Sequence, residues 1–564
     1  MQAPTPPWLR LALVCALALV ASTPSRRALA FGGLELSPGG TRALGRGGAI
    51  TARPEDPFAM IQNPAGLAVV PADQLILDVG VSLQNMCETP YGYYGWGVYS
   101  PGNSQFGDPT KAPYATDALD RVCNSTPPAA LPGIAYDMRI NDDLGIGFGM
   151  LAPTVLGALQ YGGVDGTIQG ESGPRPTPTR YQLVKQALTA AFAPAVGVGY
   201  RVLPRLRIGV TFQWVGAATE TTAVQSQGSG TNPTTDMLVR VRAHDYFIPG
   251  VTLGVLATPI DSFDVALAAR MYDSFNGSGD ARYTTFPYLR GATSGHIPFQ
   301  NDPMTLPSVQ SNLPWVFSAG FRYANPLPGV PADARGVARR GDPLGTERFD
   351  VELDFGYQLN ARTSHVRATV DGGEVIARSV SGPPDILKVT NATFDQDRHL
   401  ADSVTVRVGS TYNVIPKRLG VSAGTFYESR GVDPAYANID TFSFSRIGVG
   451  LGLVARVSRW DFALAYGHVF QETLIVAPPD NQPRQNATDN PASGFDKRVG
   501  APQDATGGKV LIEQNPPAAS QIDGRARFLQ PALLPSPTAR SRVVNAGVYE
   551  ASYNTISASA AYRF

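Results

Sequence analysis

Apolar residues recur along much of this chain with a period of two. In 75–83, five apolar residues alternate with Ile76, Asp78, Gly80 and Ser82; they are Leu75, Leu77, Val79, Val81 and Leu83. Such alternation is typical of a strand with one apolar face. In a water-soluble protein that face meets a core, whereas in a membrane barrel it meets lipid and the other face lines a lumen. One strand alone does not separate these interpretations.

The alternation continues along the chain, and the whole set of strands is more informative than any one. Further strands are expected at 134–138, 144–151, 181–201, 205–215, 246–257, 263–272, 315–323, 349–358, 404–412, 420–427, 442–456, 460–470 and 543–564. About fourteen strands of this length are typical of a bacterial outer-membrane barrel. The sequence therefore predicts an all-β fold, a transmembrane antiparallel β-barrel over 73–564.

Short and long connections alternate between these strands. The short ones are 141–143, 203–205, 259–261, 414–417 and 457–459, and the long ones are 84–130, 153–179, 218–243, 273–312, 361–400 and 471–540. Several long structureless loops are unusual in a soluble domain, whereas outer-membrane barrels combine short periplasmic turns with long external loops. One connection departs from the pattern: 324–346 falls where a short turn is due, and we interpret it as an inserted periplasmic loop.

Residues 1–30 have the pattern of a secretory signal peptide. Arg10 precedes an apolar run over 11–21, and 28–30 reads Ala-Leu-Ala, an A-x-A cleavage site. The run is shorter than the roughly 20 residues of a spanning helix. We therefore expect an exported chain that begins at Phe31. Export leaves Cys87 and Cys123, for which an oxidising compartment favours a disulfide over free thiols.

Composition and charge exclude some classes of function. Only 16% of residues are charged and the formal net charge is zero, whereas soluble domains average about a quarter charged. Neutrality gives no electrostatic reason to expect a nucleic-acid partner. The five histidines are scattered without ligand-like spacing, so we expect no metal site and no cofactor.

A glycine- and proline-rich segment, 41–68, precedes the first strand. Because it holds three glycines in a short run and a later Asn-Pro-Ala, it can form neither a long helix nor a regular strand. We expect 31–72 to form a compact hatch of short turns. The residues concerned are Gly45, Gly47, Gly48, Asn63, Pro64 and Ala65.

This run, Gly-Arg-Gly-Gly-Ala followed by Asn-Pro-Ala, resembles the N-terminal hatch of the FadL type of outer-membrane transporter. Segments 193–209, 401–409 and 420–434 are also similar to that family. The resemblance implies a monomeric barrel in the outer membrane of a Gram-negative bacterium. It also implies a hydrophobic small-molecule ligand, such as a long-chain fatty acid or a hydrocarbon.

The resemblance further implies a mechanism. Ligand binding would shift 31–36, the hatch would rearrange, and ligand would leave sideways into outer-membrane lipid through a gap beside a kink in the third strand. That strand carries Gly145, Gly147 and Gly149 on one face, where nothing projects inward. The alternative is that these glycines only make room for the hatch.

Period two places a set of arginines on the lumen faces of the strands: Arg207, Arg270, Arg322, Arg407, Arg446 and Arg456. Cationic donors suit the head group of an anionic ligand in an apolar pocket. The other interpretation is an ion-pair ladder with Glu352, Asp354 and Asp461 that fills the barrel. The sequence leaves both open.

Two further motifs bear on function. The match to Gly-x-Ser-x-Gly at 420–424 opens a strand, whereas a nucleophile elbow needs a following helix, so we expect no enzyme.

The last strand ends on Phe564, on the same face as Tyr562; this resembles the signal read by the barrel assembly machinery. The competing functions are a polar-solute porin and a surface-binding or adhesive barrel acting through its loops.

Overall fold

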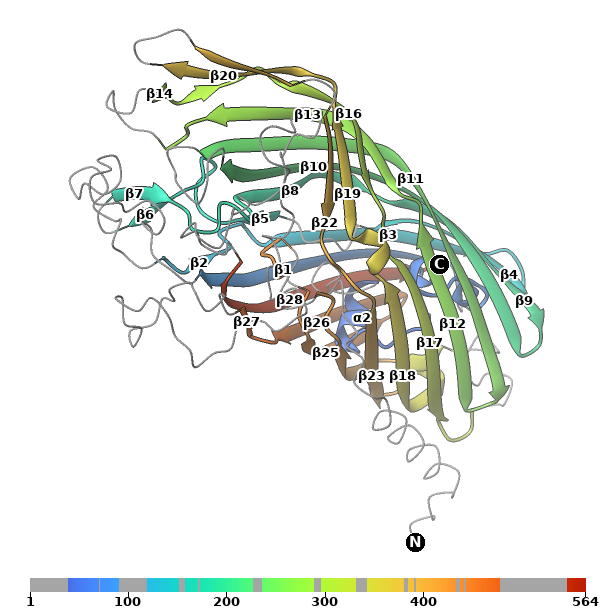
Figure 1. Cartoon of the computed structure of the whole chain (residues 1–564). Coiled ribbons are helices and arrows are strands. Elements are labelled where there is room, and N and C mark those ends of the chain that lie inside the picture. Colours follow the sequence, from blue (N-terminus) through green and yellow to red (C-terminus); the bar gives the residue numbers. More distant parts are fainter. Residues whose placement is uncertain are drawn as a thin grey trace.

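The alternating segments pair into a closed antiparallel barrel in the computed structural model of this chain (Figure 1). The structure describes residues 39–69, 72–90, 119–151, 158–170, 173–226, 236–288, 296–330, 342–379, 384–389, 392–432, 437–440, 443–476 and 545–564. The expected signal peptide and most of the loops 84–130 and 471–540 lie outside them.

The barrel wall has 14 strands, and the strand prediction is confirmed. Each strand pairs with the next around the ring, and the first pairs with the last from Gln74–Arg563 to Pro90–Gly547. In order, the wall strands are β1 (Gln74–Pro90), β3 (Ala129–Arg139), β4 (Leu144–Leu151), β9 (Pro194–Leu203), β10 (Leu206–Ser226), β11 (Asp236–Ile260), β12 (Phe263–Tyr272), β17 (Trp315–Pro326), β18 (Glu347–Leu359), β23 (Ser403–Ile415), β24 (Leu419–Glu428), β25 (Arg446–Val457), β26 (Trp460–Gln471) and β28 (Gly547–Arg563).

The outer surface of the wall is apolar. Leu77, Val79 and Leu464 are more than half exposed, whereas Asp78, between two of them on β1, is only 4% exposed. This is the reverse of a water-soluble protein, in which the apolar face would be covered. Because lipid replaces the core as the apolar phase, the strands present their apolar side chains outward.

Aromatic side chains mark both rims of this apolar surface. At the end that carries the tight turns, here called the turn end, they are Trp460, Tyr562 and Phe564, whose rings contact one another in sequence. At the opposite end, the loop end, Trp214 contacts Phe247 beside the exposed Tyr246. Such aromatic belts mark the two membrane–water interfaces of a barrel.

At the loop end the structure differs from the expected loops. Segments 218–243, 273–312 and 361–400 contain strands, because β10 and β11 continue past the wall and four more strands extend their sheet (Figure 1): β13 (Phe275–Thr285), β16 (Met304–Ser311), β19 (His365–Val370) and β22 (Ala392–Asp397). The alternation of Ala281 and Tyr283 with Asp280 and Arg282 carried this signal. Glycine and polar neighbours obscured it.

Several expected strands have different bounds in the structure. The segment 181–201 contains two strands, β8 (Lys185–Phe192) and β9, separated at Ala193 opposite the register shift between Val215 and Ala217. The strand expected at 442–456 begins only at Arg446. The shorter strands are β2 (Val122–Cys123), β5 (Ala158–Gln160), β6 (Thr167–Gly170), β7 (Gly173–Pro176), β14 (His296–Ile297), β15 (Phe299–Gln300), β20 (Gly373–Ser379), β21 (Asp385–Val389) and β27 (Leu474–Val476).

The helices of the described residues are all short. They are α2 (Gly40–Gly45), α3 (Ala59–Gln62), η1 (Pro64–Ala68), α4 (Pro343–Thr346) and η6 (Ala361–Thr363). None of them is long and apolar enough to cross a membrane. The first three belong to residues 39–69, here called the N-terminal segment, and α4 ends the inserted connection 324–346.

Candidate functional site in the barrel lumen

The N-terminal segment lies against the lumen side of the wall, where glycines leave room for its backbone. A Cβ on Gly209 would lie 2.2 Å from the carbonyl carbon of Pro64, and one on Gly145 would lie 2.0 Å from the Leu67 oxygen. Gly424, on the other half of the ring, approaches the Arg46 oxygen equally closely. The segment therefore contacts strands from both halves of the ring and occupies the lumen between them (Figure 1).

Asn63 fixes one turn of the segment to the wall. Its Nδ2 donates to the carbonyl oxygens of Thr51 (2.9 Å) and Val255 (3.1 Å), and its Oδ1 accepts from the amide of Ala65 (3.2 Å). The proline that follows needs no amide acceptor at the first position of η1. Asn-Pro-Ala thus starts a helical turn and also joins it to β11.

The glycine run makes a second tight turn. Gly47 and Gly48 have φ values of 64° and 83°, a region that glycine adopts without steric cost. Gly47 lies against the Thr425 amide, and Gly45 lies against Gly452 on β25. A side chain at Gly45 or Gly47 would push the segment away from β24 and β25.

Two arginines of the segment meet carboxylates on β18. Arg46, 1% exposed, donates to Asp350 and Glu352 at 2.9 Å each, and Arg53 donates to Asp350 at 2.6 Å. The same strand accepts backbone amides: Asp354 from Ile50 and Thr51, and Glu352 from Ala52. Buried charges need partners and hydrogen bonds. The N-terminal segment supplies the cations and amide donors, and β18 supplies the carboxylates that accept from them.

Arg322 on β17 extends this network along the wall, from β18 to β12. It donates to Asp350 (2.8 Å) and Asp264 (3.0 Å) and is also paired with Glu347. Together these groups form what we call the ion-pair layer: Arg46, Arg53, Arg322, Asp264, Glu347, Asp350, Glu352 and Asp354.

At the turn end, the short helix α4 lies against β18, and the residue before it joins a second group of charged side chains. Asp342, just before α4, pairs with Arg456 and Arg563, and both of these arginines also pair with Asp461. A polar cavity of about 30 Å³ remains between α4 and the N-terminal segment, which is room for a few waters. The inserted connection therefore contributes Asp342 to a group of four charged residues at this end. We call this group, Asp342, Arg456, Asp461 and Arg563, the turn-end lid or Asp342 lid.

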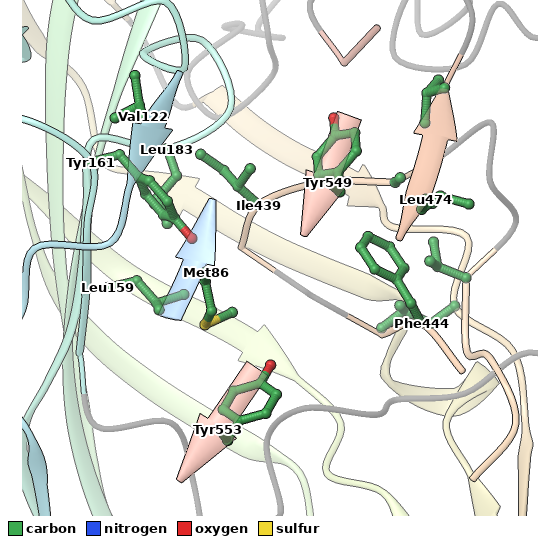
Figure 2. Packing of buried hydrophobic residues seen from close by; sticks show 14 of the residues in the cluster. Met86, Val122, Leu159, Tyr161, Leu183, Ile439, Phe444, Leu474, Tyr549 and Tyr553 are labelled. Atoms are coloured by element: carbon green, nitrogen blue, oxygen red, sulfur yellow. The ribbon is translucent and has the colours of Figure 1, made fainter. Parts of the chain in front are cut away.

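The loop end of the lumen is apolar instead. Buried side chains from the wall strands, short strands and connections pack together there (Figure 2). This apolar cluster contains Met86, Val122, Leu159, Tyr161, Leu183, Leu400, Val432, Ala437, Ile439, Phe444, Val469, Leu474, Val476, Tyr549 and Tyr553. Its tyrosines Tyr161, Tyr549 and Tyr553 are fully buried.

A disulfide holds one side of the apolar cluster. Cys87 on β1 and Cys123 on β2 are bonded, as expected from the sequence. Their chain neighbours Met86 and Val122 both belong to the cluster. The bond thus ties the connection that supplies Val122 to the wall.

The predicted lumen arginines fall into different environments. Arg322 and Arg446 are buried in ion pairs, Arg446 with Glu428 at 2.9 Å, and Arg456 belongs to the turn-end lid. Arg270 lies over the Tyr272 ring at 6.0 Å. Arg322, Arg446 and Arg456 thus form ion pairs inside the barrel, as the second of the two sequence-based interpretations expected.

Arg207 and Arg407 differ from the others because the described residues offer neither a carboxylate within ion-pair distance. Arg207 is fully buried on the turn-end side of Pro64, and its three guanidinium nitrogens have no acceptor. Arg407 is half-buried. It lies two residues closer to the loop end than Gly409, where an added Cβ would contact Arg46 and Ala49. Arg407 is opposite Asp354 in the pairing of β18 with β23 and therefore lies at the loop-end edge of the ion-pair layer.

The glycine face of β4 is occupied by the N-terminal segment. A Cβ on Gly147 would contact Leu67 and Met60, as one on Gly145 would contact Leu67, whereas Gly149 faces Ala135 on β3. β4 pairs with β3 up to Gly133–Leu151 and with β9 up to Met150–Pro194. Over its described length this strand therefore has neighbours on both sides.

Sequence reasoning missed part of the site. It took Arg46 only as part of a glycine motif and did not single out Arg53 or Asp350. Two arginines in an otherwise apolar and glycine-rich segment were the available signal, because buried charges imply opposite charges elsewhere.

Comparison with known proteins shows the fold. No family model matches the chain, and no curated protein matches it. Among solved structures, a Pseudomonas aeruginosa FadL homologue is similar with a TM-score of 0.58 at 13% identity, over 94% of this chain and all of that chain. The P. putida toluene transporter TodX is similar with a TM-score of 0.54 at 11% identity, over 93% of this chain and 98% of that one.

These findings define the class of the protein. It is a closed 14-stranded membrane barrel with the fold of FadL-type structures. Its lumen holds the apolar cluster at the loop end, together with the buried Arg446–Glu428 ion pair, and the ion-pair layer nearer the turn end.

Proposed function

We propose that this chain is an outer-membrane transporter that takes up hydrophobic small molecules, long-chain fatty acids or similar compounds, without a cofactor. The loop end would face outward and the turn end the periplasm. The N-terminal segment would act as the hatch. The division of the lumen into an apolar cluster and an ion-pair layer carries the proposal. It agrees with the fold shared with the FadL homologue and with TodX, which is named as a toluene transporter.

The two zones of the lumen favour different steps. A hydrophobic ligand gains about 25 cal/mol for each Å² of apolar surface that it buries among the side chains of the apolar cluster. To continue along the axis it would have to break buried ion pairs, at about 3–5 kcal/mol each. Release sideways into lipid avoids that cost, so we propose that ligand leaves through the wall after the hatch rearranges.

Arg407 is the residue we assign to the ligand's head group. It lies half-buried at the loop-end edge of the ion-pair layer, opposite Asp354, and forms no ion pair with a described residue. A charged hydrogen bond contributes about 1.5–3 kcal/mol. Arg407→Gln should therefore weaken binding of oleate by about tenfold to a hundredfold and leave binding of a neutral alkylbenzene unchanged.

The first test is mass spectrometry of what co-purifies with the detergent-extracted barrel, followed by titration with oleate and an alkylbenzene. Arg121→Gln is a matched control, since Arg121 forms an exposed surface pair with Glu550. A bound or titratable hydrophobic compound supports uptake. A barrel that binds neither compound would contradict the proposal and favour a surface-binding role.

A further inference from the structure

The sheet that extends beyond the wall at the loop end carries a row of cations. Register places Lys185 (β8) opposite Thr222 (β10), which is opposite Arg240 (β11), and Arg240 is opposite Arg282 (β13). One pair closer to the wall, Glu220 is opposite Arg242, which is opposite Asp280. Residues opposite one another in register share a face of the sheet. We call Lys185, Arg240, Arg242 and Arg282 the cationic face.

This face points away from the protein. The alternate residues Val239, Ala281 and Tyr283 are buried in a second apolar cluster with Met304 and Leu306, so the cations lie on the opposite side. Their side chains are accessible: that of Arg242 is 48% exposed and that of Arg282 is 40% exposed.

The carboxylates on the cationic face do not neutralise it. Glu220 pairs with both Lys185 and Arg242 at 2.9 Å, and Arg282 lies 3.8 Å from Asp280. Arg240 makes no ion pair with any described residue, and the Nε atoms of Arg240 and Arg282 lack an acceptor. Burial alone would raise the pKa of Glu220, but the hydrogen bonds from Lys185 and Arg242 lower it. Four cations thus share two carboxylates.

The height of the face above the membrane is set by the aromatic belt. Arg242 lies four residues beyond Tyr246, whose side chain is 52% exposed at the loop-end rim. At about 3.3 Å per residue, and with the tilt of barrel strands, Arg242 lies about 10 Å beyond the rim and Arg240 about 15 Å. That is the depth of lipid head groups, outside the hydrocarbon core.

We propose that the cationic face binds the phosphorylated saccharide head groups of glycolipid in the outer leaflet. Guanidinium groups bind phosphate oxygens in a bidentate fashion, and this face presents three of them at head-group height. A phosphate would give Arg240 the anionic partner that the described residues do not supply. The inference rests on the proposed outer-membrane location with the loop end outward.

The test uses the full-length barrel in detergent and native mass spectrometry with bisphosphorylated lipid A. Arg240→Gln/Arg242→Gln/Arg282→Gln should weaken binding about fivefold for each cation removed, on the order of a hundredfold in all. The matched control, Arg139→Gln/Arg201→Gln/Arg205→Gln, removes the same charge from exposed pairs at the turn end and should bind lipid A like the wild type.

Two comparisons make the result decisive. Dephosphorylated lipid A should bind wild type as weakly as the bisphosphorylated lipid binds the triple variant, and inorganic phosphate should not displace the lipid. Equal loss in the control variant, unchanged binding in the triple variant, or binding independent of the phosphates would overturn the inference. Oleate binding is read separately in the same samples, so failure of the uptake proposal is distinguishable from failure of this one.

Discussion

At the scale of single residues, Arg46 connects the N-terminal segment to the wall more than any other described side chain. Its guanidinium reaches Asp350, Glu352 and Thr411, and its Nε donates to the Ala49 carbonyl. A buried arginine is costly unless its donors are satisfied. In this structure Arg46 has two carboxylate partners and donates four hydrogen bonds, which offset the cost of burying its charge.

Replacing Arg46 should loosen the segment locally. In Arg46→Met the carboxylates of Asp350 and Glu352 lose a partner, which costs about 3 kcal/mol, since Arg53 and Arg322 still neutralise Asp350. Hydrogen exchange of the amides in 49–52 should accelerate roughly a hundredfold. Arg121→Gln, in an exposed pair, should change it by less than about fivefold. Unchanged exchange in Arg46→Met would show that the ion-pair layer does not hold the segment.

At the scale of elements, the wall and the N-terminal segment fit together because glycines occupy certain lumen-facing positions of the strands and leave no side chain there. Gly209 on β10 and Gly254 on β11 are opposite each other, and Asn63 and Pro64 lie on that pair. Glycine weakens a strand by itself. In this barrel, hydrogen bonding to both neighbours compensates, and the glycines allow the two backbones to approach.

A methyl group at one of these contacts should displace the segment. Gly209→Ala places a Cβ 2.2 Å from the Pro64 carbonyl carbon, which is backbone and cannot rotate away, so we expect about 1–3 kcal/mol of overpacking. Tryptic cleavage after Arg42 and Arg46 should become faster. Gly80→Ala is the control, because its nearest neighbours are 3.4 Å away. Equal protection of the two variants would contradict the close fit.

At the scale of the whole molecule, the lumen is blocked twice by different means. Apolar packing occupies the loop end, and the ion-pair layer with the Asp342 lid occupies the turn end. An open aqueous pore needs neither. The two blocks together favour the proposed hydrophobic uptake over the porin alternative.

The double block predicts little ion conductance. In planar bilayers the wild-type barrel should give no steady open-channel current, because the N-terminal segment contacts strands from both halves of the ring and the apolar cluster packs at the loop end. A variant that lacks 39–69 should conduct, provided that heat-modifiable migration on gels shows a folded barrel. A steady current through the wild type would support a polar-solute porin instead.

The wall was predictable from the sequence because its signal is local. Period two, tight turns and an apolar outer face each follow from a few neighbouring residues, so all 14 strands were found. The disulfide between Cys87 and Cys123 followed from elimination and compartment. The strands that extend the sheet, such as β13 and β16, were missed because glycines and polar residues interrupt their pattern.

The sequence by itself determined the barrel and its even strand number. Only the tertiary structure decided which charges meet. Arg46 and Asp350 lie 304 residues apart, and lumen-facing arginines look alike in sequence whether they are paired, as Arg322 is, or uncommitted, as Arg407 is. Strand formation depends on neighbours along the chain, whereas the partner of a buried charge depends on which strands the closed ring brings together.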